Sequence, residues 1–218
     1  MSTINGKGIS FKRYLMLLIG IYFMGTGIAL IIKSSTGTSP MSSLTNVMTQ
    51  VIPVLSLGTY TFLLNFLFFI GEFIVEPKSF APAKFLQLIP TFILSVAVDA
   101  NMMMFANVSP SSYVLQLVVL LIGCAFFGLS IAFMISANVI LMPGEAFIKI
   151  ICGKYHKEYG NIKTIVDVSL VILAVIVSLI CLHTIYGVRE GTLIAALTIG
   201  TFSRIFRKFT NILAGETA

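Results

Sequence analysis

Two carboxylates stand in otherwise apolar stretches and could act directly on a solute or an ion. Glu145 follows Pro143 and Gly144, and Asp167 interrupts an apolar run that extends from Ile165 to Leu182. A carboxylate inside a membrane costs about 2.5 kcal/mol or more unless it is paired or hydrated, which makes it a candidate for binding or proton transfer. The alternative for Glu145 is structural, because a helix dipole favours a carboxylate in the first turn. The alternative for Asp167 is a neutral, hydrogen-bonded side chain that holds helices together.

Hydroxyl side chains stand at the other proline that opens a short segment. Thr38 and Ser39 precede Pro40. Proline suits the first turn of a helix, and a hydroxyl just before it can accept a hydrogen bond from the free N–H groups there. The partial positive charge of that helix end suits an anionic or hydrogen-bond-accepting part of a substrate.

Two asparagines complete the candidate set. Asn65 lies seven residues after Gly58, just as Asp167 lies seven residues after Gly160. Asn138 offers a second polar contact on the loop that carries Glu145. We therefore predict one polar site, near the centre of a bilayer, whose substrate-binding residues are Thr38, Ser39, Asn65, Asn138, Glu145 and Asp167.

No catalytic, metal-binding or cofactor-binding pattern accompanies these residues. No Ser-His-Asp, His-Glu-x-x-His or phosphate-loop pattern is present. The 3 cysteines are scattered without Cys-x-x-Cys spacing, which indicates neither disulfides nor zinc. The adjacent Met102, Met103 and Met104 point in different directions on a helix, so we expect lipid contact rather than a soft metal there. We expect no enzyme activity, no metal site and no cofactor.

The composition is that of a membrane protein. Hydrophobic residues make up 57% of the 218 and charged residues only 10%, whereas a soluble domain is about 25% charged. The stretches from Tyr14 to Ile32 and from Tyr113 to Ile135 contain no charged residue, and each exceeds the roughly 18 residues of a spanning helix. The net charge of +6 is distributed in short groups between apolar spans. That distribution is typical of cytoplasmic loops, so we expect the lipid bilayer as a partner and no nucleic acid.

The two halves of the chain repeat each other. The segment from Gly20 to Ala29 aligns with that from Gly123 to Ala132 at an offset of 103, and Pro40 falls on Pro143 at the same offset. Each half holds a long span, a short segment opened by proline and two further spans. At about 1.5 Å per residue the short segments cannot cover a hydrocarbon core of about 30 Å. They are either re-entrant half-helices or helices buried against others.

The basic residues favour re-entrant half-helices and six spans. That topology places 12 Lys and Arg residues in the cytoplasm and 2 outside, whereas crossing short segments would give 10 and 4. The predicted fold class is an all-α membrane bundle of two inverted repeats, each of three spans plus one half-helix. Its segments are a cytoplasmic N-terminal segment 1–13; repeat 1 over 14–105, with spans 14–33, 58–75 and 83–105 and half-helix 40–53; repeat 2 over 113–207, with spans 113–135, 162–182 and 189–206 and half-helix 143–152; and a cytoplasmic tail 208–218.

Several motifs resemble those of the YczE/YyaS/YitT family of bacterial integral membrane proteins. The resemblance implies a duplicated fold in the bacterial cell (inner) membrane with both termini cytoplasmic, and it supplies no substrate and no established site. The chain departs from the family at Met142-Pro143-Gly144-Glu145, where relatives carry a Gly-Pro-basic-acidic run. The motifs are Gly27-Ile28-Ala29-Leu30, Thr36-Gly37-Thr38-Ser39-Pro40, Ser56-Leu57-Gly58-Thr59-Tyr60-Thr61 with Asn65, and Glu190-Gly191-Thr192-Leu193-Ile194-Ala195-Ala196-Leu197 with Gly200.

Inverted repeats are the usual plan of transporters and some channels. We therefore expect a membrane transporter or channel-like protein for a small polar solute, bound where the two half-helix N-termini meet, with a homo-oligomer as a possible assembly. The alternative is a non-transporting membrane scaffold or accessory factor, which would bury the half-helix ends against apolar side chains and leave no cavity. Of the remaining charges, Glu72 and Arg204 are expected to extend from span ends toward the interface, and Asp99 to lie at an interface or in a cavity.

Overall fold

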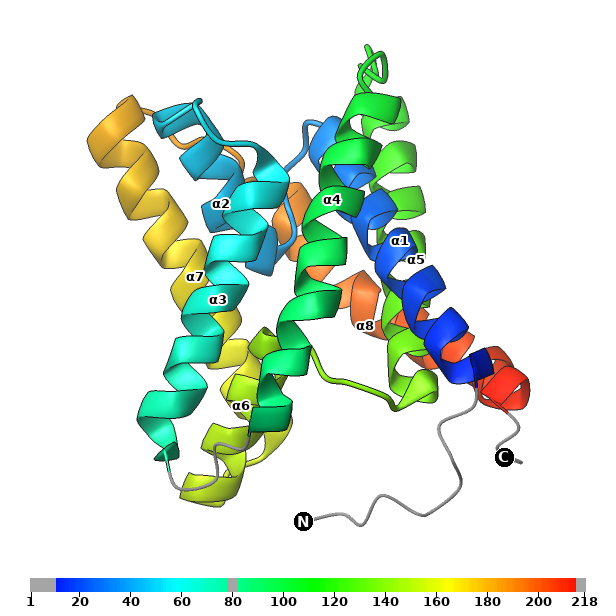
Figure 1. The fold of residues 1–218 in the computed structure, drawn as a ribbon. Helices are drawn as coiled ribbons and strands as arrows, with labels where there is room; N and C mark the ends of the chain where they lie inside the picture. The colour runs from blue at the N-terminus through cyan, green and yellow to red at the C-terminus, as the bar shows by residue number, and fades with distance from the viewer. Residues whose placement is uncertain (1–10, 78–81, 215–218) are drawn as a thin grey trace.

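The computed structural model describes residues 11–77 and 82–214, and every regular element in this part of the chain is a helix (Figure 1). The predicted all-α class is confirmed for these residues. The elements, in chain order, are α1 (Phe11–Lys33), α2 (Pro40–Val51), α3 (Leu57–Val75), the 3-10 helix η2 (Pro82–Gln87) that leads into α4 (Leu88–Met104), α5 (Tyr113–Ala137), α6 (Pro143–Tyr155), α7 (Tyr159–Leu182) and α8 (Glu190–Ala214).

Five of the helical segments are long and apolar enough to cross a membrane: α1, α3, η2 with α4, α5 and α7. The sixth predicted span, α8, has 25 residues but carries Glu190, Arg204, Arg207 and Lys208, and it does not meet the same criterion. α8 also continues to Ala214, past the predicted end of the last span at residue 206. Arg and Lys are good helix formers, so they interrupt an apolar stretch without ending the helix.

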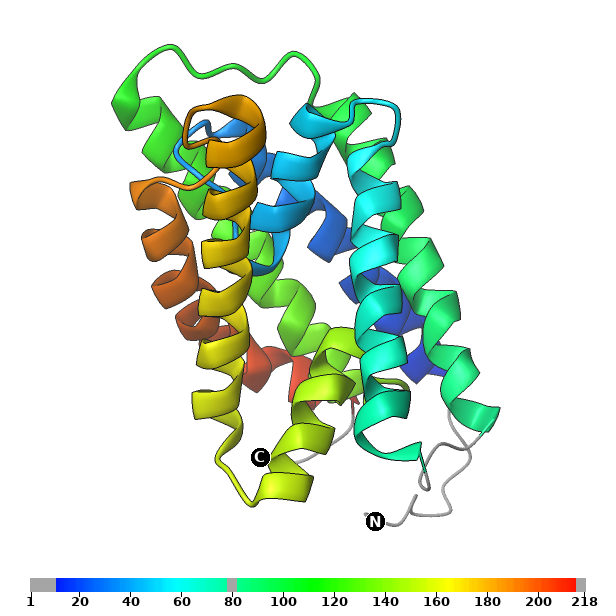
Figure 2. The ribbon, with the colours of Figure 1, turned by 90° about the vertical axis from the view of Figure 1, so that its left-hand side faces the viewer.

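The two short helices lie at opposite ends of the molecule, α2 in the upper half and α6 in the lower half of Figures 1 and 2. They have 12 and 13 residues, and each begins with a proline in its first turn after an extended residue, Ser39 or Met142. At about 1.5 Å per residue, neither is long enough to cross a hydrocarbon core of about 30 Å. α2 ends before Pro53, which cannot continue a helix.

The helices form two groups, and each group takes helices from both halves of the sequence. In the first group α1 packs on α5, α4 packs on α1, and α8 packs on α5. In the second group α2 packs on α7 and α3, and α6 packs on α3 and α7. The groups are joined mainly by α3 against α4. Figure 1 shows the first group on the right and the second on the left.

Small residues let the central helices α1 and α5 approach closely. A Cβ atom on Gly27 would lie 2.7 Å from the backbone N of Phe127, and one on Gly123 would lie 2.9 Å from the backbone N of Ile31. The apolar core is built around this contact and includes Ile21, Val98 and Leu120, all fully buried.

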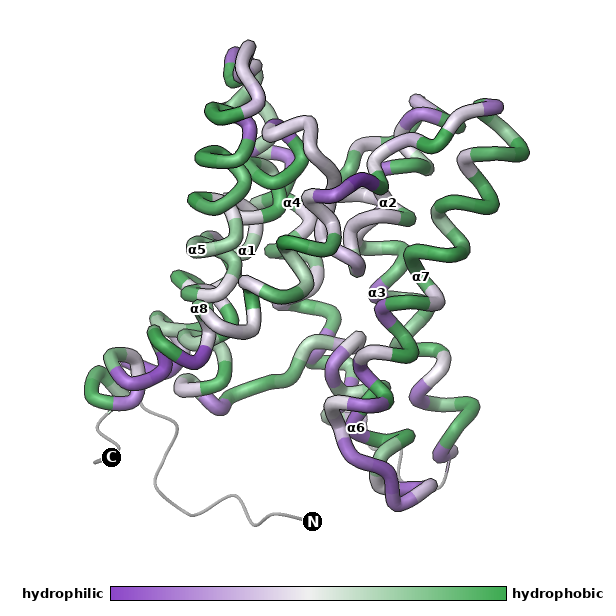
Figure 3. Tube along the Cα trace, turned by 180° about the vertical axis from the view of Figure 1, so that it is seen from behind, coloured by the Kyte–Doolittle hydropathy of each residue, from purple (hydrophilic) through white to green (hydrophobic). Residues whose placement is uncertain are grey.

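The outward faces of the helices are apolar. Ile172, Ile176 and Ile180 on α7 are all exposed, and Figure 3 shows hydrophobic residues along α5 and α7 with hydrophilic ones near the lower ends of α6 and α8. Such faces suit contact with lipid rather than water. The protein is thus a helical membrane protein whose α1 begins, and whose α8 ends, at the same end of the bundle (Figure 1).

Candidate functional site

A cavity of about 850 Å³ opens between the two helix groups, at the end of the bundle opposite the start of α1. It is bordered by the end of α1, the polar side of α2, the start of α3 and the last turns of α4. Small-molecule sites have volumes of about 300–1,000 Å³, so the cavity is large enough for a small solute. None of the six predicted site residues lines it.

The helix α2 supplies the amide side chains of the cavity. Asn46, Thr49 and Gln50 line it, and their spacing of three and four residues places them on one face of a helix. The Thr49 hydroxyl donates to the carbonyl oxygen of Asn46 at 2.7 Å, and Gln50 is exposed toward the opening. This face was not predicted from the sequence, although the i, i+3, i+4 spacing within a segment too short to span the membrane indicates it.

Asp99 on α4 is one of two charged residues in the cavity wall. Its Oδ1 accepts from the backbone N–H of Gly58 at 2.7 Å and its Oδ2 from the hydroxyl of Ser56 at 2.6 Å. A Cβ atom on Gly58 would clash with the carbonyl oxygen of Ser95, so this glycine lets α3 begin directly against α4. Asp99 therefore both caps α3 and lies in the cavity wall. Of the two positions expected for it, at an interface or in a cavity, the structure shows the second.

The other charged lining residue, Lys33, is the last residue of α1. Its Nζ donates to the carbonyl oxygen of Ala106 at 3.3 Å. The cavity wall therefore combines one cation, one carboxylate and several neutral amides and hydroxyls. Such a wall can hydrogen-bond a polar solute through both donors and acceptors.

Thr38 is bound to the connection between α7 and α8. Its backbone N–H donates to the hydroxyl oxygen of Thr192 at 3.2 Å, and its own hydroxyl donates to the carbonyl oxygen of Gly187 at 2.9 Å. The backbone N–H of Gly191 donates to the carbonyl oxygen of Thr36 at 2.9 Å. Thr38 is buried, so these bonds satisfy its polar groups inside the protein.

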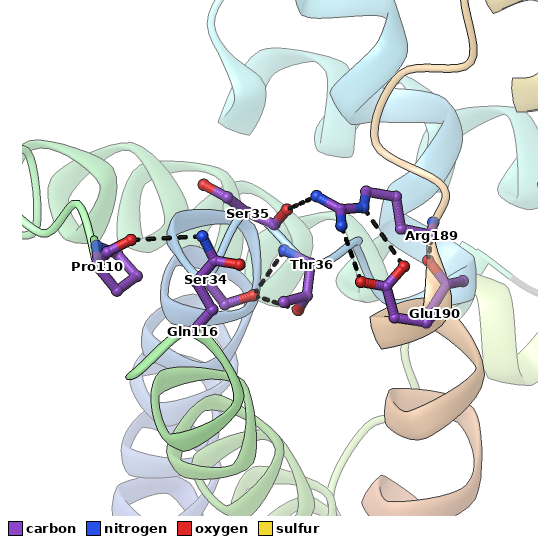
Figure 4. A network of polar contacts seen from close by, with 8 residues as sticks. Ser34, Ser35, Thr36, Pro110, Gln116, Arg189 and Glu190 are labelled. Carbon is purple, nitrogen blue, oxygen red and sulfur yellow. Dashed lines mark hydrogen bonds and ion pairs between the residues drawn. The ribbon is translucent and has the colours of Figure 1, made fainter. Parts of the chain in front are cut away.

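Arg189 reinforces the same junction from its outer side (Figure 4). Its Nη1 donates to the carbonyl oxygen of Ser35 at 3.0 Å, and its Nη2 pairs with Glu190 at 2.9 Å. Beneath it the hydroxyls of Ser34 and Thr36 lie 2.9 Å apart. The junction fixes the loop before α2 onto the start of α8.

The first turns of α2 and α6 meet in the interior. A Cβ atom on Gly144 would lie 2.8 Å from Cε of Met41 and 3.5 Å from the ring of Phe68. Ser39 is buried, and its hydroxyl donates to the Ser42 hydroxyl at 2.8 Å. Met142 is also buried, with its sulfur 3.9 Å from the Thr91 hydroxyl. The contact between the two short helices is therefore closed and mostly apolar.

Glu145 and Asp167 lie around one cation, Lys163. The Nζ of Lys163 donates to Oδ1 and Oδ2 of Asp167 at 2.9 and 3.0 Å. Lys163 is also close enough to Glu145 for its charge to act on that carboxyl group, and both carboxyl groups act on Tyr159. The structure thus pairs Asp167 with Lys163 on α7, and Glu145 on the neighbouring helix α6 lies within range of the same charge. Lys163 was missed as a partner, although it stands four residues before Asp167 on one helix face.

The two asparagines make local contacts. Asn65 is half-buried, and its Nδ2 donates to the carbonyl oxygen of Thr61 one turn earlier, at 2.9 Å. Asn138 is exposed and ends α5 with φ of 47°, in the left-handed region. Asparagine tolerates that conformation better than most residues, which accounts for its identity at this position.

Residues 11–208 match a protein family described as a family of unknown function, DUF6198. The chain belongs to this family. No curated protein and no solved structure matches the chain. The match to DUF6198 runs from the start of α1 into the last turns of α8, so the cavity and both short helices lie within it.

Proposed function

We propose that this protein moves a small polar solute across the bacterial cell membrane, as a transporter or channel-like protein, and that the cavity is its outward-facing vestibule. The observation that carries the proposal is the polar wall of the cavity within an otherwise apolar bundle. Asn46, Thr49 and Gln50 face a space of about 850 Å³ instead of being paired across a helix contact. In a membrane protein, a polar cavity between apolar helices is typical of a solute or ion pathway.

The orientation follows from the basic residues. Lys33 ends α1 and Arg189 precedes α8 at the end of the bundle where the cavity opens. The other described basic residues of the loops and helix ends, which belong to the opposite end, are Lys12, Arg13, Lys84, Lys149, Lys154, Lys157, Lys163, Arg204, Arg207 and Lys208. The positive-inside rule assigns that richer end to the cytoplasm, so the cavity opens outward and both termini are cytoplasmic.

We further propose that the two halves are inverted repeats. The helix contacts support this, because exchanging α1–α4 with α5–α8 largely reproduces them. The pair α2 and α7 corresponds to α6 and α3, α2 and α3 to α6 and α7, and α1 and α4 to α5 and α8. The largest departure from the symmetry is that α3 packs on α4 far more extensively than α7 on α8. Inverted-repeat transporters alternate between states in which the two halves differ in this way.

In this account the two helix groups rock against each other about the contact of α3 with α4. Met41 and Met142 close the path beneath the vestibule. The group of Glu145, Lys163 and Asp167 lies beyond that closure, on the α6 and α7 side. A solute leaving the vestibule would reach these charges only after the closure opens. In this proposal the predicted residues Glu145 and Asp167 therefore form a second binding region, which the solute reaches after the vestibule.

The alternative is a membrane scaffold or accessory factor, and one observation favours it. The ends of the short helices are closed by apolar side chains and internal hydrogen bonds, as a scaffold requires. The cavity is the feature that a scaffold does not need.

A panel of polar solutes tested for thermal stabilisation of the purified protein separates the two functions. A solute that binds the native state raises its apparent stability, so we expect at least one to raise the Tm of the wild type. Gln50→Leu should reduce that rise, whereas Ser169→Ala, on the exposed face of α7, should keep it. Solutes that stabilise Gln50→Leu and the wild type equally would contradict a site in this cavity.

A further inference from the structure

Glu72 is a fully buried carboxylate on α3, with 0% of its side chain exposed. The sequence predicted that it would extend toward the interface, and that prediction is wrong. Phe147 packs on the neighbouring Gly71, which encloses this turn of α3. The Nζ of Lys84, on η2, lies 3.3 Å from its Oε2 and forms an ion pair. The Glu72 side chain therefore does not extend to the membrane interface, and its charge lies inside the protein.

Three side-chain acceptor atoms are buried at this place. Both carboxyl oxygens of Glu72 and the Oε1 of Gln87 are buried and lack a hydrogen-bond partner among the described residues. The Lys84 ammonium and the Gln87 amide face the Glu72 carboxyl group as donors, and Gln87 is itself buried. An ionised carboxylate can only accept hydrogen bonds, whereas a protonated one has an O–H to donate. Leaving a buried acceptor unpaired costs about 1–3 kcal/mol.

We propose that Glu72 is a proton-binding site, at which a single proton from water on the cytoplasmic side adds to the buried carboxylate. The step forms one O–H bond and needs no other reactant. It also removes the negative charge that attracts Lys84. This inference deepens the proposed function, on which it rests, by naming the coupling ion.

The position of the ion pair gives the proton a mechanical effect. Glu72 belongs to α3, in one helix group, and Lys84 belongs to η2, which leads into α4 in the other group. The rings of Phe69 and Phe85 make a second contact between the same elements, with centroids 5.3 Å apart. Neutralising Glu72 removes the charged part of this connection at the cytoplasmic end, where a rocking motion has to separate the groups.

Few other charges act near Glu72. On α6, the Nζ of Lys154 donates to the carbonyl oxygen of Val75 at 2.8 Å. On α4, the titratable group is Asp99, at the opposite end of that helix, and α2 carries no titratable residue. The charged residues of the elements packed against this part of α3 are Lys84 on η2 and Glu145, Lys149 and Lys154 on α6, together with Glu76 after the end of α3.

Infrared difference spectra of the full chain in lipid nanodiscs, recorded between acidic and alkaline pH, test the site without a transport assay. We expect the carboxylic-acid C=O band of a buried group in the wild type. Glu72→Gln should remove that band, whereas Glu76→Gln, on an exposed carboxylate four residues further along, should keep it. Lys84→Met removes the positive partner, so the protonated band should persist to higher pH in that variant.

Two results would overturn the inference: a band unchanged in Glu72→Gln, or the same titration in Lys84→Met as in the wild type. The Lys84→Met arm decides the question even if Glu72→Gln fails to fold. In proteoliposomes, a pH gradient should drive uptake of a stabilising solute by the wild type but not by Glu72→Gln. If the wild type and Glu72→Gln both take up the solute at a rate that does not depend on the pH gradient, Glu72 does not couple transport to protons. No uptake at all would instead refute the proposed function, while the spectra would still decide the proton site.

Discussion

Three carboxylates inside the bundle have particular partners among the described residues. Asp167 pairs with Lys163, Glu72 pairs with Lys84, and Asp99 accepts hydrogen bonds from the start of α3. In a medium of low dielectric constant, removing one partner leaves an uncompensated group, which is costlier than replacing both. The three carboxylates therefore differ in their surroundings: Asp99 lies in the cavity wall and caps α3, whereas Asp167 and Glu72 each form an ion pair.

Asp99→Ala should destabilise the protein by about 1–2 kcal/mol, because it removes the cap of α3 and leaves the N–H of Gly58 unpaired. Thermal unfolding of the purified variant should show a lower Tm. Val96→Ala, on the exposed face of the same helix, is the control and should leave the Tm nearly unchanged. Equal values for the two variants would show that Asp99 does not cap α3.

At the residue scale, the sequence predicted which polar residues matter better than it predicted which groups they contact. Thr38 and Ser39 are buried near the start of α2, but their hydroxyls donate to Gly187 and to Ser42. The partner of Thr38 lies 149 residues away, and spacing within one segment cannot reveal such a contact. Asn138 was chosen for its polarity, whereas its tolerance of positive φ accounts for it.

At the scale of elements, the close approach of α1 and α5 depends on glycine. A Cβ atom on Gly27 would lie within 3.0 Å of three atoms of α5, two of them in the backbone, so a larger side chain has to push the helices apart. This contact is the centre of the core. The stability of the first helix group therefore depends on a surface that hydropathy alone does not reveal.

Gly27→Ala should destabilise the protein by about 1–3 kcal/mol, the usual cost of overpacking a dense interior. Gly200→Ala on α8 is the matched control, because a Cβ atom there meets nothing within 4 Å. Replacing an exposed helical glycine with alanine gains roughly 0.5–1 kcal/mol. Tm values should move in opposite directions. A Gly27→Ala protein as stable as the wild type would mean that α1 and α5 are not so close.

The short helices were predictable as elements because proline marks their first turn and their length rules out a crossing. Their starts at Pro40 and Pro143 follow from the conformation that proline imposes. The face of α2 that lines the cavity was not predicted, since it depends on how α2 packs against α7. The end of α8 was not predicted either, because hydropathy marks the apolar stretch that lies in the bilayer, whereas the helix continues beyond it to Ala214.

At the scale of the whole molecule, the proposed transport requires the two helix groups to rock against each other. The groups mix helices from both sequence halves and meet through α3 and α4. The duplication visible in the sequence predicted paired elements but not this division, which depends on contacts between the repeats. The cavity arises at one end of the boundary between the groups, and the pair of Glu72 and Lys84 lies at the opposite end.

The central claim is that the cavity is a vestibule open to the outside. Its most direct test is labelling of Gln50→Cys, in a background whose 3 native cysteines are replaced by alanine, with a membrane-impermeant thiol reagent on intact cells. We predict that Gln50→Cys reacts from outside and that a stabilising solute protects it, while Lys157→Cys reacts only after the membrane is opened. A Gln50→Cys protein that reacts only in opened membranes, or that no stabilising solute protects, would contradict the account.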